Sequence, residues 1–136
     1  MRFLIAICIC LFTTAIHVHA DFLYPENSSK IIMSANKFYS STNIQYSEFN
    51  DATLNIRKKF LYKNLEKVIK NEVKGDDNLF INLRNIYISK NPNISPNRQV
   101  YLFCSVKDTS KSLVYKYIII DGETSKTLAE GSRKAN

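Results

Sequence analysis

The stretch from Asp51 to Lys74 constrains the fold most, because its apolar residues recur with a helical spacing. At about 100° per residue, they fall on one stripe that covers roughly a third of the helix circumference. Asn50 or Asp51 can cap the N-terminus of such a helix, and Gly75 suits the left-handed residue just past its C-terminus. The pattern predicts one long amphipathic helix, and its stripe residues are Leu54, Leu61, Leu65, Val68 and Ile69.

The opposite side of this predicted helix carries lysines at steps of four, four, three and four. Ile56 and Phe60 lie off the apolar stripe, which indicates that the first turns are covered on a second side. A lysine face is usually a solvated surface, but here it is also a candidate for binding an anionic partner. The candidate residues are Lys59, Lys63, Lys67, Lys70 and Lys74.

The first 20 residues have the order of a secretory signal peptide. Arg2 supplies a positive start, an apolar run extends from Phe3 to Phe12, and cleavage fits best after Ala20. This run is shorter than the ~20 residues of a membrane-spanning helix, and no later segment is long and apolar enough. We therefore expect a secreted or periplasmic protein whose mature chain, residues 21–136, has no transmembrane segment.

The predicted mature chain lacks the residues that many hydrolases use. His17 and His19 leave with the signal peptide, as do Cys8 and Cys10, so that Cys104 remains as a single cysteine and no histidine remains. An internal disulfide, histidine metal sites, and Cys/His or Ser/His nucleophilic catalysis are thereby excluded. We expect no cofactor and no enzyme activity.

The chain is basic, with a formal net charge of +7 that becomes +6 when Arg2 is removed. Such an excess favours anionic partners. A secreted destination disfavours nucleic acid, which leaves another protein or an anionic polymer of the cell envelope as the expected partner.

Most of the chain outside the helix is predicted to form short strands, at residues 30–35, 42–47, 79–89, 99–107, 113–121 and 126–130. Residues 99–107 alternate with apolar residues on both faces, which is typical of a central strand. Cys104 shares its face with Val100, Leu102 and Val106 and is therefore predicted to be buried. Along residues 79–89 the alternation changes phase, so this strand needs a bulge at Arg84 and Asn85.

The order of these elements predicts an α+β fold, in which an antiparallel sheet of about four to six strands packs on one long amphipathic helix. Removing 20 of the 136 residues leaves 116, a size that suits a single domain. Residues 21–29 are polar and read as a mobile lead-in, and the residues from Gly131 onward read as a polar tail.

A loop rich in proline and asparagine separates two of the predicted strands. Its two prolines exclude regular strand pairing, so that the loop should be exposed. Exposed loops on a rigid sheet commonly carry binding residues, which makes this loop a second candidate site. The loop residues are Asn91, Pro92, Asn93, Ile94, Ser95, Pro96 and Asn97.

The segment from Tyr117 to Gly131 reads YIIIDGETSKTLAEG: a strand ends at Asp121, and after a turn another begins with the apolar pair Leu128 and Ala129. It resembles the closing hairpin of curli-secretion-type and related bacterial periplasmic lipoprotein domains. Ser125 stands where those domains usually have glycine, and their lipid-attachment cysteine is absent. The resemblance implies a place in a bacterial envelope.

Two classes of function remain open from the sequence. The first is a small non-enzymatic binding or accessory protein that contacts an anionic envelope component or another protein. The second is an inhibitor of a foreign enzyme, with the loop from Asn91 to Asn97 as its wedge, or a small enzyme that works without histidine.

Overall fold

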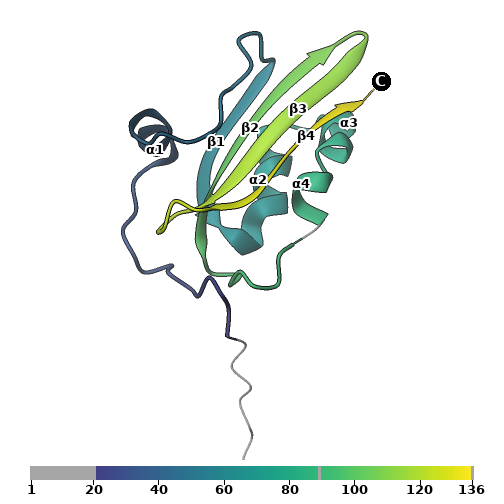
Figure 1. Ribbon diagram of the computed structural model, residues 1–136. Coiled ribbons are helices and arrows are strands. Elements are labelled where there is room, and N and C mark those ends of the chain that lie inside the picture. Colours follow the sequence, from purple (N-terminus) through teal and green to yellow (C-terminus); the bar gives the residue numbers. More distant parts are fainter. Residues whose placement is uncertain (1–20, 89, 136) are drawn as a thin grey trace, which may run out of the picture.

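Two long strands, β2 (Gln99–Thr109) and β3 (Ser112–Asp121), form the centre of the fold, as their alternating apolar residues predict. The computed structural model describes residues 21–88 and 90–135, and the predicted signal peptide lies outside them. The sheet is antiparallel in the order β1-β2-β3-β4, with β1 (Leu54–Leu61) and β4 (Thr127–Ala135) at its edges (Figure 1). Together with several short helices, it makes an α+β fold.

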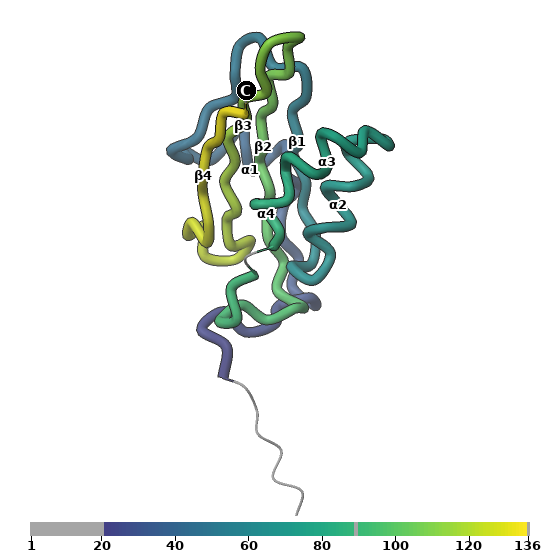
Figure 2. Tube along the Cα trace, turned by 90° about the vertical axis from the view of Figure 1, so that its right-hand side faces the viewer, coloured from purple at the N-terminus to yellow at the C-terminus, as the bar shows by residue number. Residues whose placement is uncertain are grey.

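Three short helices and a 3-10 turn cover one face of the sheet (Figures 1 and 2). They contribute Leu65 and Ile69, and the C-cap of α3 contributes Leu83; these residues pack on the sheet in one apolar cluster with Leu102 and Cys104. Along α2 the buried residues Leu65 and Ile69 are four positions apart, so that one side of this helix faces the strands. The elements are η1 (Tyr62–Asn64), α2 (Leu65–Glu72), α3 (Asp77–Asn82) and α4 (Asn85–Ile88).

The other face of the sheet is covered by α1 (Ala35–Ser41) and the segments beside it. Ser34 caps this helix by accepting a hydrogen bond from the backbone N–H of Lys37. Phe38 stacks on Tyr101 with ring centroids 4.3 Å apart, and it also packs near Phe103. The prediction that β2 is apolar on both faces and central is therefore confirmed.

The prediction of one helix from Asp51 to Lys74 is wrong. Leu54–Leu61 is strand β1, and only Leu65–Glu72 of the stretch is α-helical. The apolar residues of β1 that face the helices follow a period of two, so that Ile56, which lies off the helical stripe, is fully buried and pairs with Cys104. Gly75 does have the expected left-handed conformation, with φ of 86°.

Three of the predicted strands are also wrong. Residues 79–88 lie in α3, α4 and the turn between them, because Leu79, Leu83 and Ile86 are buried at helical steps of four and three while Ile81 and Ile88 are exposed. Residue 89 lies outside the described part. Residues 30–34 and 42–47 form no strand, and the predicted polar tail at 131–135 belongs to β4.

The N-terminal lead-in is attached to the domain. Tyr24 forms a parallel bridge with Ile94, in which the N–H of Tyr24 donates to the carbonyl of Asn93 at 3.0 Å. Asn27 is 2 % exposed and bonds to Gln99 at the start of β2. These contacts argue against a mobile segment at residues 22–27.

Cys104 lies in the core and is fully buried, as its position in the alternation predicts. Burial raises the pKa of its thiol to about 12. Because the thiolate is the reactive form, labelling of the native protein with a thiol reagent should be slow and should become fast in denaturant. Mass spectrometry of timed samples measures both rates; rapid labelling of the native protein would contradict this placement.

Candidate functional site

The five candidate lysines do not share one face, because the helix that would align them is absent. Lys59 lies on β1 and donates to the carbonyl of Ile32 at 2.9 Å. Lys63 lies in η1, Lys67 and Lys70 lie on α2, and Lys74 follows that helix. The lysine face is thus divided among a strand, a turn and a helix.

Lys63 instead joins the second candidate, the loop from Asn91 to Asn97. Its ammonium donates to Oδ1 of Asn97 at 2.8 Å, and its backbone N–H donates to the carbonyl of Pro96 at 3.0 Å. The sequence proposed this lysine and this loop as separate candidates. The fold brings them together, because η1 and the loop both lie at the end of the sheet where β1 stops and β2 starts.

A groove of about 260 Å³ lies between the loop and η1, and we call it the loop groove. Its walls are mainly apolar, and two lysines, Lys63 and Lys90, lie among its lining residues. Both lysines are exposed. The groove is lined by Phe22, Tyr62, Lys63, Lys90, Asn91, Pro92, Ile94 and Pro96.

The walls of the loop groove are held by buried anchors. The hydroxyl of Tyr62 accepts a hydrogen bond from the backbone N–H of Asn91 at 2.8 Å, and Tyr62 is 6 % exposed. Ile94 is 3 % exposed and belongs to the main core. Because both ends of the loop wall are fixed, the groove is formed before any ligand arrives, which lowers the entropic cost of binding.

A second hollow of about 220 Å³ lies on the other side of the wall that Tyr62, Asn91 and Ile94 make. It lies between α4 and strands β3 and β4, where Tyr117, Leu128 and further residues line it. This hollow therefore adjoins the loop groove and reaches β4.

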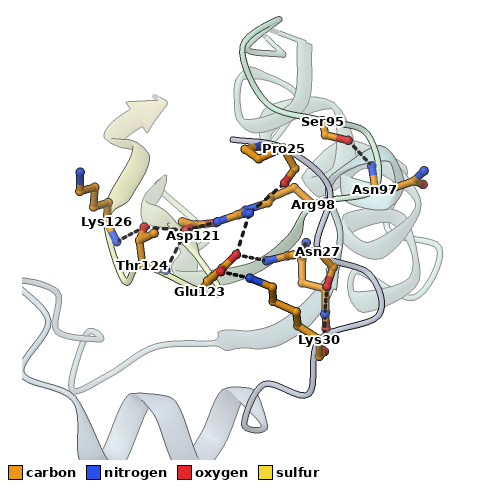
Figure 3. A network of polar contacts seen from close by, with 11 residues as sticks. Pro25, Asn27, Lys30, Ser95, Asn97, Arg98, Asp121, Glu123, Thr124 and Lys126 are labelled. Atoms are coloured by element: carbon orange, nitrogen blue, oxygen red, sulfur yellow. Dashed lines mark hydrogen bonds and ion pairs between the residues drawn. The ribbon is translucent and has the colours of Figure 1, made fainter. Parts of the chain in front are cut away.

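The other polar centre of the molecule is the Arg98 cluster, made by Arg98, Asp121, Glu123, Thr124 and Asn27 (Figure 3). Arg98 binds both carboxylate oxygens of Asp121, at 2.6 and 2.8 Å, and both side chains are buried. Its remaining nitrogen donates to the carbonyl of Pro25 and pairs with Glu123 at 2.8 Å. This cluster joins the lead-in to the β3–β4 turn.

The charged groups of the Arg98 cluster form hydrogen bonds with one another and with neighbouring residues. Oδ2 of Asp121 also accepts from the backbone N–H of Thr124 at 2.8 Å and from its hydroxyl. Burial raises the pKa of Asp121, but the bonds from Arg98 and Thr124 more than offset it, so that the pKa lies below its ordinary value. A hollow of about 350 Å³ lies over the cluster, but the charges of Arg98 and Glu123 are already paired there. We therefore assign the cluster a structural role.

Several other acidic side chains have structural partners. Asp51 pairs with Lys107, and Glu72 pairs with Lys58 at 3.0 Å. Asp76 caps α3 by accepting from the backbone N–H of Leu79. Within residues 21–88 and 90–135, no group of three or more His, Cys, Asp or Glu side chains is placed to hold a metal ion. None of the helices in this described part is long and apolar enough to cross a membrane.

Sequence reasoning missed Phe22, Tyr62 and Lys90 as groove residues and missed the pair of Arg98 with Asp121. The members of each set are distant in the chain, and the contacts between them arise from the fold. One signal was present: Asp121 ends an apolar strand, and an acidic residue placed there needs a partner when it is buried.

No family model matches this chain, and neither the curated proteins nor the solved structures contain a match.

Proposed function

We propose that this protein is a non-enzymatic binding protein of the secreted or periplasmic space, and that its loop groove binds an acidic segment of another protein. The observation that carries the proposal is the combination of apolar walls with Lys63 and Lys90 in one preformed groove. Pockets that are mostly apolar, with few polar groups that orient the ligand, are typical binding sites.

The two lysines determine which sign of charge the ligand should carry. Their ammonium groups favour a carboxylate beside the apolar part of the ligand, and the net charge of the chain, +7, favours the same sign. Since both lysines are exposed, they contribute more to the rate of encounter and to selectivity than to affinity.

The apolar walls favour a protein segment over an anionic envelope polymer. Phe22 and Pro92 expose apolar surface there, backed by the buried Tyr62 and Ile94. A phosphate-rich or sugar-rich chain has little apolar area with which to cover that surface. A segment with an apolar side chain next to an acidic one uses both parts of the groove.

A fluorescent acetylated peptide of glutamate and phenylalanine provides a first probe, and fluorescence anisotropy measures its affinity. Exposed charge pairs are worth about 0.2 to 1 kcal/mol each, so that the double variant Lys63→Gln/Lys90→Gln should bind about two- to thirtyfold more weakly. Phe22→Ser should also weaken binding. Peptides in which lysine replaces glutamate, or serine replaces phenylalanine, should bind less well.

The matched control is Lys37→Gln/Lys111→Gln, which removes the same charge from α1 and from the β2–β3 turn. Its affinity for the probe should be unchanged. Equal weakening of binding by both double variants, or preference for a polyphosphate chain over the peptide, would refute the loop groove as the binding site. Either result would indicate a general attraction of anions to the protein.

A further inference from the structure

The edge strand β4 has an outer side that is open for pairing. In the described part of the chain, no backbone hydrogen bond joins β4 to any strand but β3. Figure 2 shows β4 at the margin of the sheet. An edge strand of nine residues with free N–H and C=O groups is a template for adding another strand.

We propose that β4 pairs antiparallel with β4 of a second copy of this chain, across a two-fold axis at Ser132, so that two sheets join into one. This proposal does not depend on the loop groove. It rests on the charge pattern of β4 and on the pleat of the strand.

The pleat limits the possible registers. Directly opposite residues of an antiparallel pair lie on the same face of the sheet. A two-fold axis perpendicular to the sheet keeps each face on its own side, so two residues that lie opposite each other must have sequence numbers that differ by an even number. With the axis at Ser132, Glu130 of each copy lies opposite Lys134 of the other. Two ion pairs then cross the interface, and Ala129 lies opposite Ala135.

Glu130 and Lys134 lie on one face of β4, because they pair with Ile118 and Val114 of β3. Moving the axis to Gly131 sets Glu130 opposite serine, and moving it to Arg133 sets two arginines against each other. Opposite charges across a strand pair stabilise it, whereas like charges destabilise it. The register at Ser132 is thus the one in which the charges of β4 complement themselves.

The other edge, β1, has the reverse pattern. Arg57, Lys58 and Lys59 follow one another in the middle of that strand. An antiparallel pair of two copies of β1 about Lys58 would set Lys58 opposite Lys58 and Arg57 opposite Lys59. Arg57 and Lys58 have partners in Glu48 and Glu72, but no anion of β1 itself would face these cations across the pair. Runs of lysine commonly protect edges from pairing. The contrast between the edges selects β4 as the interface, in an isologous dimer.

The decisive test mixes two variants of the protein purified from cells that express the full chain. In Glu130→Lys both opposing positions become cationic, and in Lys134→Glu both become anionic, so that each variant alone should associate at least about tenfold more weakly than the wild type. Mixed together, the two variants should form a heterodimer, because each pair across the axis is again one cation and one anion. Sedimentation velocity measures the wild type, each variant alone and the mixture of the two variants.

A cysteine at the axis tests the register independently. Ser132→Cys should form a disulfide-linked dimer quickly under mild oxidation, since the two side chains face each other, and Cys104 is buried and stays out of the reaction. Ser110→Cys, in the exposed β2–β3 turn, controls for random collisions and should crosslink slowly. A wild type that stays monomeric at all concentrations, a mixture of variants that fails to associate, or equal crosslinking of the two cysteines would overturn the proposal.

Discussion

Replacing Asp121 with asparagine should destabilise the protein by about 3 to 5 kcal/mol, because it leaves the guanidinium of Arg98 buried without its bidentate partner. That loss is a large part of the roughly 5 to 15 kcal/mol that holds a domain of this kind folded. Chemical denaturation followed by circular dichroism measures it. The exposed pair of Asp51 with Lys107 is the matched control, and Asp51→Asn should leave the midpoint almost unchanged.

The same substitution should change the response to acid. Because the pKa of Asp121 is lowered in the folded protein, its ionised form contributes stability above the ordinary carboxyl pKa, and this contribution is lost as the pH falls through the folded-state pKa. Asp121→Asn removes this part of the pH dependence, so that its stability should vary less between neutral and acidic pH. An unchanged pH profile, or a loss no larger than that of Asp51→Asn, would show that the pair contributes little.

Leu65→Asp should unfold the domain, whereas Lys63→Glu, only two residues away, should not. Leu65, the first residue of α2, is 1 % exposed in the core, and burying an unpaired carboxylate there costs several kcal/mol. Lys63 is exposed in η1, where charge changes usually stay within about 0.5 kcal/mol. Thermal melts of both variants test the orientation of η1 and α2.

Leu65→Ala keeps this test quantitative if the aspartate variant does not fold. It should cost about 2 to 5 kcal/mol, as is usual when a buried leucine is truncated. Similar melting temperatures for Leu65→Ala and Lys63→Glu would mean that η1 and the start of α2 are rotated relative to the sheet.

The central strands could be predicted from the sequence, because their alternation is long and apolar on both faces. In residues 51–74, by contrast, leucines fit a helical period while Leu54, Ile56 and Phe60 fit a period of two. Residues 54–61 form a strand and not a helix because they pair with β2, and this pairing buries Ile56 fully. In residues 79–88 the burial of Leu79 and Leu83 reveals a helical period that alternation had concealed.

The candidate site could be predicted in part. Lys63 and the loop from Asn91 to Asn97 were found separately, one from charge spacing and one from proline content. Phe22 and Tyr62 could not be found, because the lead-in reaches the groove through a bridge between Tyr24 and Ile94 that no local pattern indicates. Long-range pairing of this kind depends on the whole fold.

The central claim is that the loop groove is where this protein binds a partner. A titration of the isotope-labelled protein with the glutamate and phenylalanine peptide, followed by two-dimensional NMR of its backbone amides, tests it most directly. We predict that the shifts concentrate at Phe22, Tyr62, Lys63, Lys90 and Asn91, and that they saturate together. Shifts that are scattered over the lysines of the whole surface, or that concentrate along β4 or at Arg98, would contradict the claim.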